Sequence, residues 1–159
     1  MVRRTPSMTD GHEEERSDRG KTQKKRLRLA YPKHVFRPED LLEFVELPIF
    51  TKRWEYLGLD DDDDLSALQL FIMAAPKRAK PLKGTVGIRK LRFAPEHWKK
   101  GKSGAARVLY VYFEEYALVL LCLVYGKNEV ANISDAVKRY LNTLVQEIER
   151  ELRRRRSAK

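Results

Sequence analysis

The sequence predicts an α+β domain, with a four-stranded, mostly antiparallel sheet, two N-terminal helices and one C-terminal helix. Two observations lead to this fold class. Three segments with strand patterns follow one another closely between residues 87 and 125. Apolar residues at helical spacing then run from Val137 to Leu152 and form one stripe. A further strand and the two N-terminal helices are expected within residues 43–75.

The first predicted strand covers Glu43–Phe50, where apolar residues alternate with others. Pro48 lacks an amide hydrogen, so this strand must lie at a sheet edge or end there. A short helix is expected over residues 50–57. The acids Asp60–Asp64 precede a second helical repeat, which ends at Pro76. We expect these acids to cap the second helix, because free amides and the helix dipole favour negative charge at that end.

The three later strands are predicted at Gly87–Phe93, Ala105–Glu114 and Ala117–Tyr125. The last two are joined by a very short link and should therefore be antiparallel. The final strand is apolar on both faces, which predicts a central and covered position. Ser134 is suited to cap the C-terminal helix that follows.

Composition limits the class of protein. The chain has 159 residues and one cysteine, Cys122, so it has no internal disulfide and fits a reducing compartment. Its longest apolar run is about half of the roughly 20 residues that span a bilayer. The polar start of the chain lacks a signal-peptide pattern. We therefore expect a soluble cytoplasmic protein, with a disordered basic tail at 1–34, a folded domain at 35–153 and a basic end at 154–159.

The positive charge is concentrated in one segment. The chain carries a net charge of +10. Residues 77–107 hold eleven Lys or Arg and one acid, Glu96, which is already +10, whereas the rest balances 22 basic with 22 acidic residues. Such a segment predicts a polyanionic partner, since phosphate backbones are bound mainly by Lys and Arg.

Several familiar sites are excluded. Gly101-Lys102-Ser103 matches the end of a phosphate-binding loop, but Glu96 stands where that motif requires glycine, and this loop joins two strands. The three histidines lack metal-ligand spacing. The run Asp60–Asp64 lacks the alternation and the glycine of a calcium loop. No metal and no cofactor are expected.

Basic and aromatic residues instead gather on the predicted strands. Lys90 and Arg92 are two residues apart and project from one face of a strand. Arg107 begins the next strand. Cations on a rigid sheet can bind a phosphate and stabilise charge that develops on it. Tyr110 and Tyr112 follow on the same strand as Arg107 and can stack on bases or relay a proton, but structural roles are equally open for both.

The chain from about Phe44 to Leu152 resembles the RelE/ParE superfamily of bacterial toxins, and within it the HigB-like branch of type II toxin–antitoxin systems. The resemblance is carried by the stretches FVELPIFTKRW, LKGTVGIRKLRF, GKSGAARVLYVYF, LLCLVYGKNE and ISDAVKRYL, which stand in the family's order. The RelE-like fold is a small α+β domain with a curved antiparallel sheet, in agreement with the elements predicted above.

The resemblance implies an mRNA interferase, an endoribonuclease that cuts mRNA on the ribosome without a metal. The RNA's own 2′-hydroxyl attacks the adjacent phosphate and leaves a 2′,3′-cyclic phosphate. The family's catalytic basic residues match Lys90, Arg92 and Arg107. A neutralising antitoxin, expected to be a helix-turn-helix protein, is also implied. The residues expected to contact RNA or the ribosome are Arg89, Lys99, Lys100, Lys102, Tyr110, Tyr112, Tyr125, Lys127 and Asn128.

Two positions depart from the pattern of RelE itself. RelE has an arginine where this chain has Asn128, and a tyrosine used in proton transfer where this chain has Ile133. The form YGKNE is common in the HigB-like branch. The general base stays open between Lys90, Tyr110 and Tyr125. Two other functions stay open: a ParE-like toxin directed at gyrase, and a protein that binds RNA or ribosomes without cutting.

Overall fold

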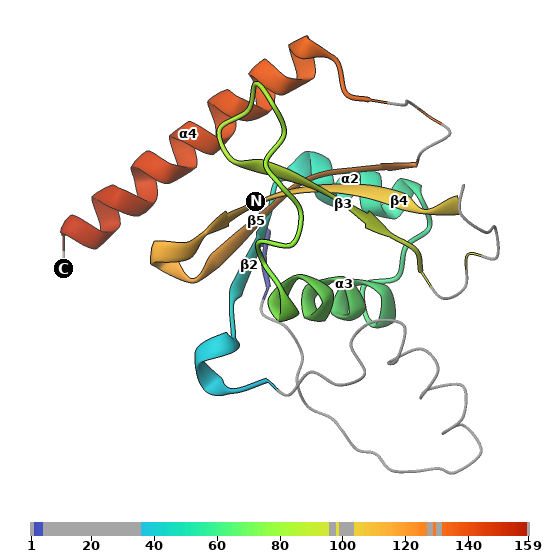
Figure 1. Cartoon of the computed structure of the whole chain (residues 1–159), viewed down its shortest axis with the longest axis horizontal. Helices are drawn as coiled ribbons and strands as arrows, with labels where there is room; N and C mark the ends of the chain where they lie inside the picture. The colour runs from blue at the N-terminus through green and yellow to red at the C-terminus, as the bar shows by residue number, and fades with distance from the viewer. Residues whose placement is uncertain are drawn as a thin grey trace.

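The structure is a computed structural model that describes residues 2–4, 36–95, 98, 104–126, 129 and 132–158. Figure 1 shows a curved sheet between helices. The strands are β1 (Val2–Arg4), β2 (Glu43–Glu46), β3 (Ile88–Phe93), β4 (Ala106–Phe113) and β5 (Leu118–Gly126). The helices are α2 (Pro48–Tyr56), α3 (Asp63–Ala74) and α4 (Asp135–Ser157), with short 3-10 turns η1 (Pro38–Asp40) and η3 (Glu114–Tyr116).

The strands form one mixed sheet in the order β1-β2-β5-β4-β3. Strands β3, β4 and β5 are antiparallel neighbours, whereas β2 runs parallel to β5. The apolar strand β5 is central, as its composition predicts. The register between β4 and β5 shifts between Leu109 and Tyr110, so that Leu109 pairs with Leu123 and Tyr110 with Leu121. Cys122 is therefore the extra residue of a β-bulge.

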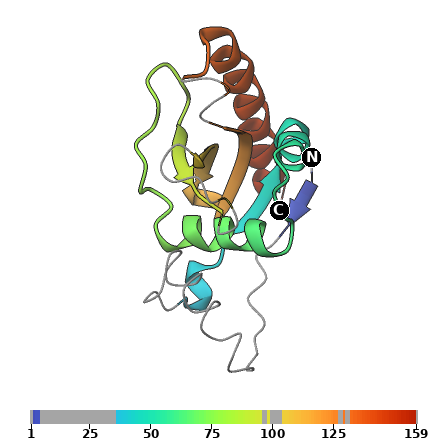
Figure 2. The ribbon, with the colours of Figure 1, turned by 90° about the vertical axis from the view of Figure 1, so that its right-hand side faces the viewer.

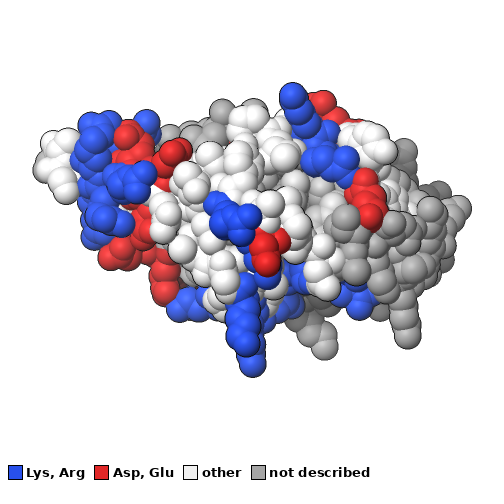
Figure 3. Space-filling model, turned by 90° about the horizontal axis from the view of Figure 1, so that it is seen from above, with Lys and Arg blue, Asp and Glu red and all other residues white. Residues whose placement is uncertain are grey.

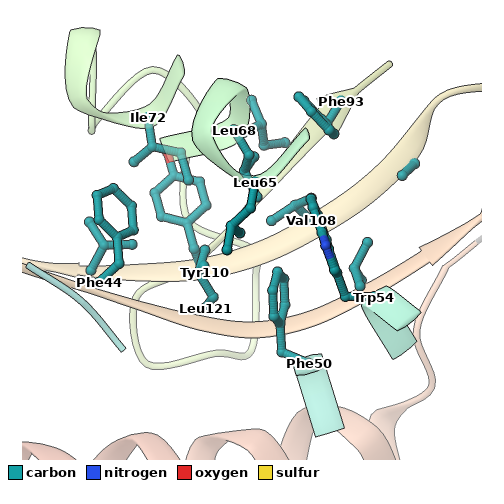
Figure 4. Close-up of a cluster of buried hydrophobic side chains, with 14 of the residues drawn as sticks. Phe44, Phe50, Trp54, Leu65, Leu68, Ile72, Phe93, Val108, Tyr110 and Leu121 are labelled. Carbon is teal, nitrogen blue, oxygen red and sulfur yellow. The ribbon is translucent and has the colours of Figure 1, made fainter. Parts of the chain in front are cut away.

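Helices cover both faces of the sheet, with α3 on one side and α4 on the other in both ribbon views (Figures 1 and 2). On the α3 face, Leu65, Leu68 and Ile72 pack over Tyr110 and Leu121 (Figure 4). Side chains of α2 join the same cluster. On the other face a second buried cluster holds the sheet against α4. Its central residues are Leu109, Val111, Leu120, Cys122, Leu141 and Val145.

Local signals explain where the helices begin. Pro48 ends strand β2 and occupies the first turn of α2, where a missing amide hydrogen costs nothing. Asp63 and Asp64 stand in the first turn of α3, but the predicted cap is not formed, because the N-cap residue Asp62 makes no side-chain hydrogen bond to the helix. The carboxylate of Asp64 instead accepts a hydrogen bond from the amide of Asp60, before the helix, at 2.8 Å. The Ser134 hydroxyl accepts from the Val137 amide at 3.2 Å and caps α4.

The predicted α+β fold with its four strands and three helices is confirmed. Two details differ. Helix α2 begins at Pro48 instead of residue 50, because proline fits a helix start better than a strand interior. Strand β1 adds a fifth, edge strand from within the segment expected to be a tail, and residues 1 and 5–34 of that segment lie outside the described residues. Within the described ranges, no helix combines the length and apolar character needed to cross a bilayer.

Candidate functional site

The register of the sheet places three of the predicted site residues side by side. Arg92 of β3 pairs with Arg107 of β4, and Arg107 pairs with Tyr125 of β5. Residues directly opposite on neighbouring strands have Cβ atoms about 4.5–5.5 Å apart. Lys90 lies two residues before Arg92 and projects from the same face. We call the set Lys90, Arg92, Arg107 and Tyr125 the basic ladder.

The ladder depends on the β-bulge at Cys122. Had the pairing of Tyr110 with Leu121 continued without a shift, Val124 and not Tyr125 would stand opposite Arg107. Because side chains alternate along a strand, the extra residue also moves every β5 side chain after the bulge to the opposite face of the sheet. Tyr125 consequently lies in the cluster on the α4 side, on the face that also carries the arginine pair.

Two cations of the ladder, Lys90 and Arg107, contact neutral groups. Lys90 Nζ lies 3.4 Å from Asn132 Oδ1 in the connection that leads to α4, and an Arg107 guanidinium nitrogen lies 3.3 Å from the Ala105 carbonyl oxygen. Among the described residues, neither Lys90 nor Arg107 makes an ion pair with a carboxylate. Two arginines directly opposite one another repel each other, and a bound phosphate would offset that repulsion.

Tyr125 is the aromatic member of the ladder. Its side chain is buried, and within the described part of the chain its hydroxyl has no hydrogen-bond partner. Burial raises the pKa of Tyr125 above the usual 10.0, and the opposing Arg107 charge lowers it less. The hydroxyl is therefore protonated at neutral pH and can donate a proton. Buried polar groups without partners are uncommon and often mark a reactive site.

Arg89 and Tyr110 lie on the opposite face and are not brought to the ladder. The Tyr110 hydroxyl donates to the Pro76 carbonyl oxygen at 2.8 Å. The Arg89 guanidinium donates to the carbonyl oxygen of Ala79 and contacts that of Lys77 at 3.4 Å. Both side chains thus fasten the connection between α3 and β3. Desolvation raises the pKa of Tyr110, with Arg89 as the largest opposing charge.

The remaining predicted contact residues are placed as follows. Tyr112 shares the α3 face with Tyr110 and packs against its apolar cluster. Burial, followed by the charge of Glu114, raises the pKa of Tyr112. Neither observation links it to the ladder. Lys99, Lys100, Lys102, Lys127 and Asn128 lie outside the described residues.

Two neighbours of the ladder were missed by the sequence analysis. Asn132 contacts Lys90, and Glu129 accepts a hydrogen bond from the Gly126 amide at 2.7 Å while pairing with Arg53 of α2. Arg53 and Glu129 are 76 positions apart in the sequence, so no local spacing relates them. The only available signal was the acid in the YGKNE stretch, whose partner a single sequence does not reveal.

A second arginine cluster, at the end of α4, differs from the ladder in its surroundings. Arg154 and Arg155 both pair with Glu151, at 2.6 and 2.7 Å. Arg156 lies 3.9 Å from Glu115. Figure 3 shows basic and acidic side chains intermingled at this end of the molecule. In the part of the chain that the structure describes, no group of His, Cys, Asp and Glu is placed to hold a metal ion.

Comparison with known proteins gives a limited likeness. No protein-family model matches the chain. Among solved structures, it is similar to that of a double arginine-to-alanine mutant of the Escherichia coli toxin RelE in the free state. The two share 22% sequence identity and a TM-score of 0.44, over 60% of this chain and 94% of the RelE chain.

Proposed function

We propose that this protein is the toxin of a type II toxin–antitoxin system, of the HigB-like branch, and that it cleaves mRNA on the ribosome. The observation that supports this most is the basic ladder, in which two facing arginines, a lysine and a buried tyrosine share one surface. Such a surface fits a phosphate and can act on it. The sequence resemblance supplies the substrate and the partner.

The reaction assigns a task to each ladder residue. The 2′-oxygen of the RNA forms a bond to the adjacent phosphorus, the bond to the 5′-oxygen breaks, and the products carry a 2′,3′-cyclic phosphate and a 5′-hydroxyl. Arg92 and Arg107 bind the non-bridging oxygens, whose negative charge grows in the transition state. Tyr125, protonated at neutral pH, is assigned to donate a proton to the departing 5′-oxygen, and because its hydroxyl is buried in the free protein, RNA binding must first uncover it.

The proton on the 2′-hydroxyl needs an acceptor. Of the three residues that the sequence offers for this role, Tyr110 is on the opposite face and its hydroxyl is bonded to Pro76. Tyr125 is assigned to the leaving oxygen. Lys90 is the remaining candidate on the ladder, next to Arg92 on the same face of β3. No metal takes part in this scheme, and the two arginines carry the positive charge, because Lys90 must be a neutral amine to accept the proton.

The test is expression of the intact chain and of Arg107→Ala. We expect the intact chain to stop growth and to create new mRNA ends within codons, detected by primer extension. Loss of one preorganised donor typically lowers a rate by about 10²–10³-fold, so Arg107→Ala should relieve toxicity. Arg154→Ala is the control, because it removes the same charge from an exposed, ion-paired arginine.

Other outcomes would contradict the proposal in distinct ways. A folded Arg107→Ala protein that stays fully toxic removes the ladder from the mechanism. Ribosome binding with intact mRNA identifies a non-catalytic RNA-binding protein instead. Trapped gyrase–DNA complexes identify a ParE-like toxin directed at gyrase. The proposed partner, a helix-turn-helix antitoxin, should be encoded beside this protein and should restore growth when expressed with it.

A further inference from the structure

Strand β5 continues beyond the end of the neighbouring strand β2. The parallel pairing between them covers only Leu118–Leu121 of β5, and Leu47 donates the last backbone bond, to the Leu121 carbonyl oxygen. Among the described residues, no strand lies beside the backbone of Val124–Gly126 on this side. Backbone amides and carbonyls at a partly buried edge require other partners.

Two side chains supply those partners. Arg53 of α2 directs its Nε toward the Val124 carbonyl oxygen, at 3.5 Å, and its guanidinium pairs with the Glu129 carboxylate. The other Glu129 oxygen accepts from the Gly126 amide at 2.7 Å. The Glu129 amide in turn donates to the Gly126 carbonyl oxygen at 3.0 Å. Two hydrogen bonds, one in each direction, therefore join Gly126 and Glu129 and close the turn.

The backbone groups that this pair binds are the direct neighbours of Tyr125. Val124 precedes Tyr125 and Gly126 follows it, and each is bound by one member of the pair. Both side chains are only about a third exposed, and the Arg53 guanidinium also lies 4.5 Å from the centre of the Tyr56 ring. An arginine that stacks on an aromatic ring and also pairs with a carboxylate has little freedom to move.

We infer that Arg53 and Glu129 are positioning residues, which fix the end of β5 so that the Tyr125 hydroxyl stays aligned with Arg107 for RNA cleavage. This inference rests on the proposed function. Because catalysis needs its groups in place to within a fraction of an ångström, small displacements cost rate more than affinity. A merely structural ion pair would change stability and leave the chemical step of the folded protein untouched.

The charge of Glu129 persists through the physiological pH range. Its hydrogen bond from Arg53, followed by the Gly126 amide bond and the Arg53 charge, lowers the pKa of Glu129 against a smaller opposing effect of burial. Arg53 and Glu129 come from different elements, α2 and the turn after β5. The pair therefore joins the first helix of the domain to the strand end that carries the reacting tyrosine.

The experiment compares Arg53→Gln, Glu129→Gln and the double variant with the intact protein. The first readout is the single-turnover cleavage rate on mRNA-programmed ribosomes. The second is affinity for ribosomes whose mRNA carries a 2′-O-methyl group at the cleaved position, where attack cannot occur. We expect the rate to fall about 10–100-fold, with affinity changed less than about threefold. The double variant should lose no more than the worse single one, as expected for two residues that act as a unit.

Glu151→Gln is the matched control, since Glu151 also pairs with arginines but lies at the far end of α4. It should leave the rate unchanged. The inference would be overturned if folded Arg53→Gln and Glu129→Gln proteins cleaved at the wild-type rate. It would also be overturned if their cleavage rates fell only in proportion to the fraction of unfolded protein. If the intact chain does not cleave mRNA at all, the proposed function fails, and hydrogen exchange decides the role of the pair. Faster amide exchange in the variants than in the intact protein, confined to residues 124–129, would support the inference that the pair fixes the strand end around Tyr125. Unchanged exchange there would refute it.

Discussion

Tyr110 and Tyr125 are both almost fully buried, at 1% and 4% exposure, but on opposite faces of the sheet. Replacing each by phenylalanine removes one oxygen and leaves the ring in place. The Tyr110 hydroxyl has a partner, the Pro76 carbonyl oxygen at 2.8 Å. The Tyr125 hydroxyl has none among the described residues. The two substitutions should therefore have opposite effects on stability and on activity.

The expected magnitudes follow from these contacts. A buried hydrogen bond contributes about 1 kcal/mol net, and an acceptor left without its donor adds to that cost. Because Pro76 is only half-buried, water can reach its carbonyl, and we expect Tyr110→Phe to cost about 1–1.5 kcal/mol. For a domain of this size that lowers Tm by roughly 3–6 °C. Tyr125→Phe removes an unpartnered buried hydroxyl and should leave Tm unchanged or slightly raised.

Activity should show the reverse order. Loss of a proton donor lowers a rate by about 10²–10⁴-fold, so Tyr125→Phe should nearly abolish cleavage in a folded protein. Tyr110→Phe should cleave at the wild-type rate once the folded fraction is taken into account. Thermal unfolding by circular dichroism and single-turnover cleavage on programmed ribosomes measure both effects on the same samples.

The opposite pattern would refute this reasoning. If Tyr110→Phe loses cleavage while remaining folded, proton transfer belongs to the α3 face and the basic ladder is not the active surface. If Tyr125→Phe lowers Tm as much as Tyr110→Phe does, the Tyr125 hydroxyl is held by a stabilising hydrogen bond, and its selection as the reactive group loses its basis.

Three further predictions concern stability. Leu121→Ala should destabilise the domain by about 3–5 kcal/mol in urea unfolding, because the side chain is fully buried at the centre of the sheet. Ser134→Ala should cost about 1 kcal/mol by the same measurement, through loss of the α4 cap. The folded pKa of Glu129 is lowered, so the stability it contributes is present above its unfolded value of about 4.3 and is lost as pH falls through the folded value. Unfolding of Glu129→Gln and of the intact protein should therefore differ at pH 7 and converge near pH 2.

Much of the fold could be predicted because its signals are local. The alternation in β3 assigned Lys90 and Arg92 to one face and Arg89 to the other, as the structure has them. The apolar character of β5 correctly indicated a central strand. The parallel pairing of β2 with β5 brings together residues far apart in the sequence, and only the packed domain determines it. The edge strand β1 lies within the segment expected to be a tail, and its pairing with β2 likewise joins residues far apart in the sequence.

The site was less predictable, because it depends on register and on the bulge. Nothing in the run from Leu118 to Gly126 marks Cys122 as an extra residue, and without it Tyr125 would face the other side of the sheet. Tyr110 and Tyr125 therefore looked equally suitable from sequence. The ion pair of Arg53 and Glu129 joins a helix to a turn, and no sequence periodicity relates the two residues.

The two arginine clusters show why net charge alone does not locate a site. On α4, neighbours at i+3 and i+4 lie on one side of the helix, so acids such as Glu151 stand within reach of the arginines that follow. Across β3 and β4 the register instead sets Arg92 against Arg107, and Arg107 and Lys90 contact neutral oxygens. Arg153, Arg154 and Arg155 pair with acids of their own helix, whereas Lys90 and Arg107 make no ion pair among the described residues and can bind an anionic partner. Neutralising the ladder should therefore reduce the salt dependence of ribosome binding more than removing as many arginines from the end of α4, since each phosphate contact contributes its own share of released counterions.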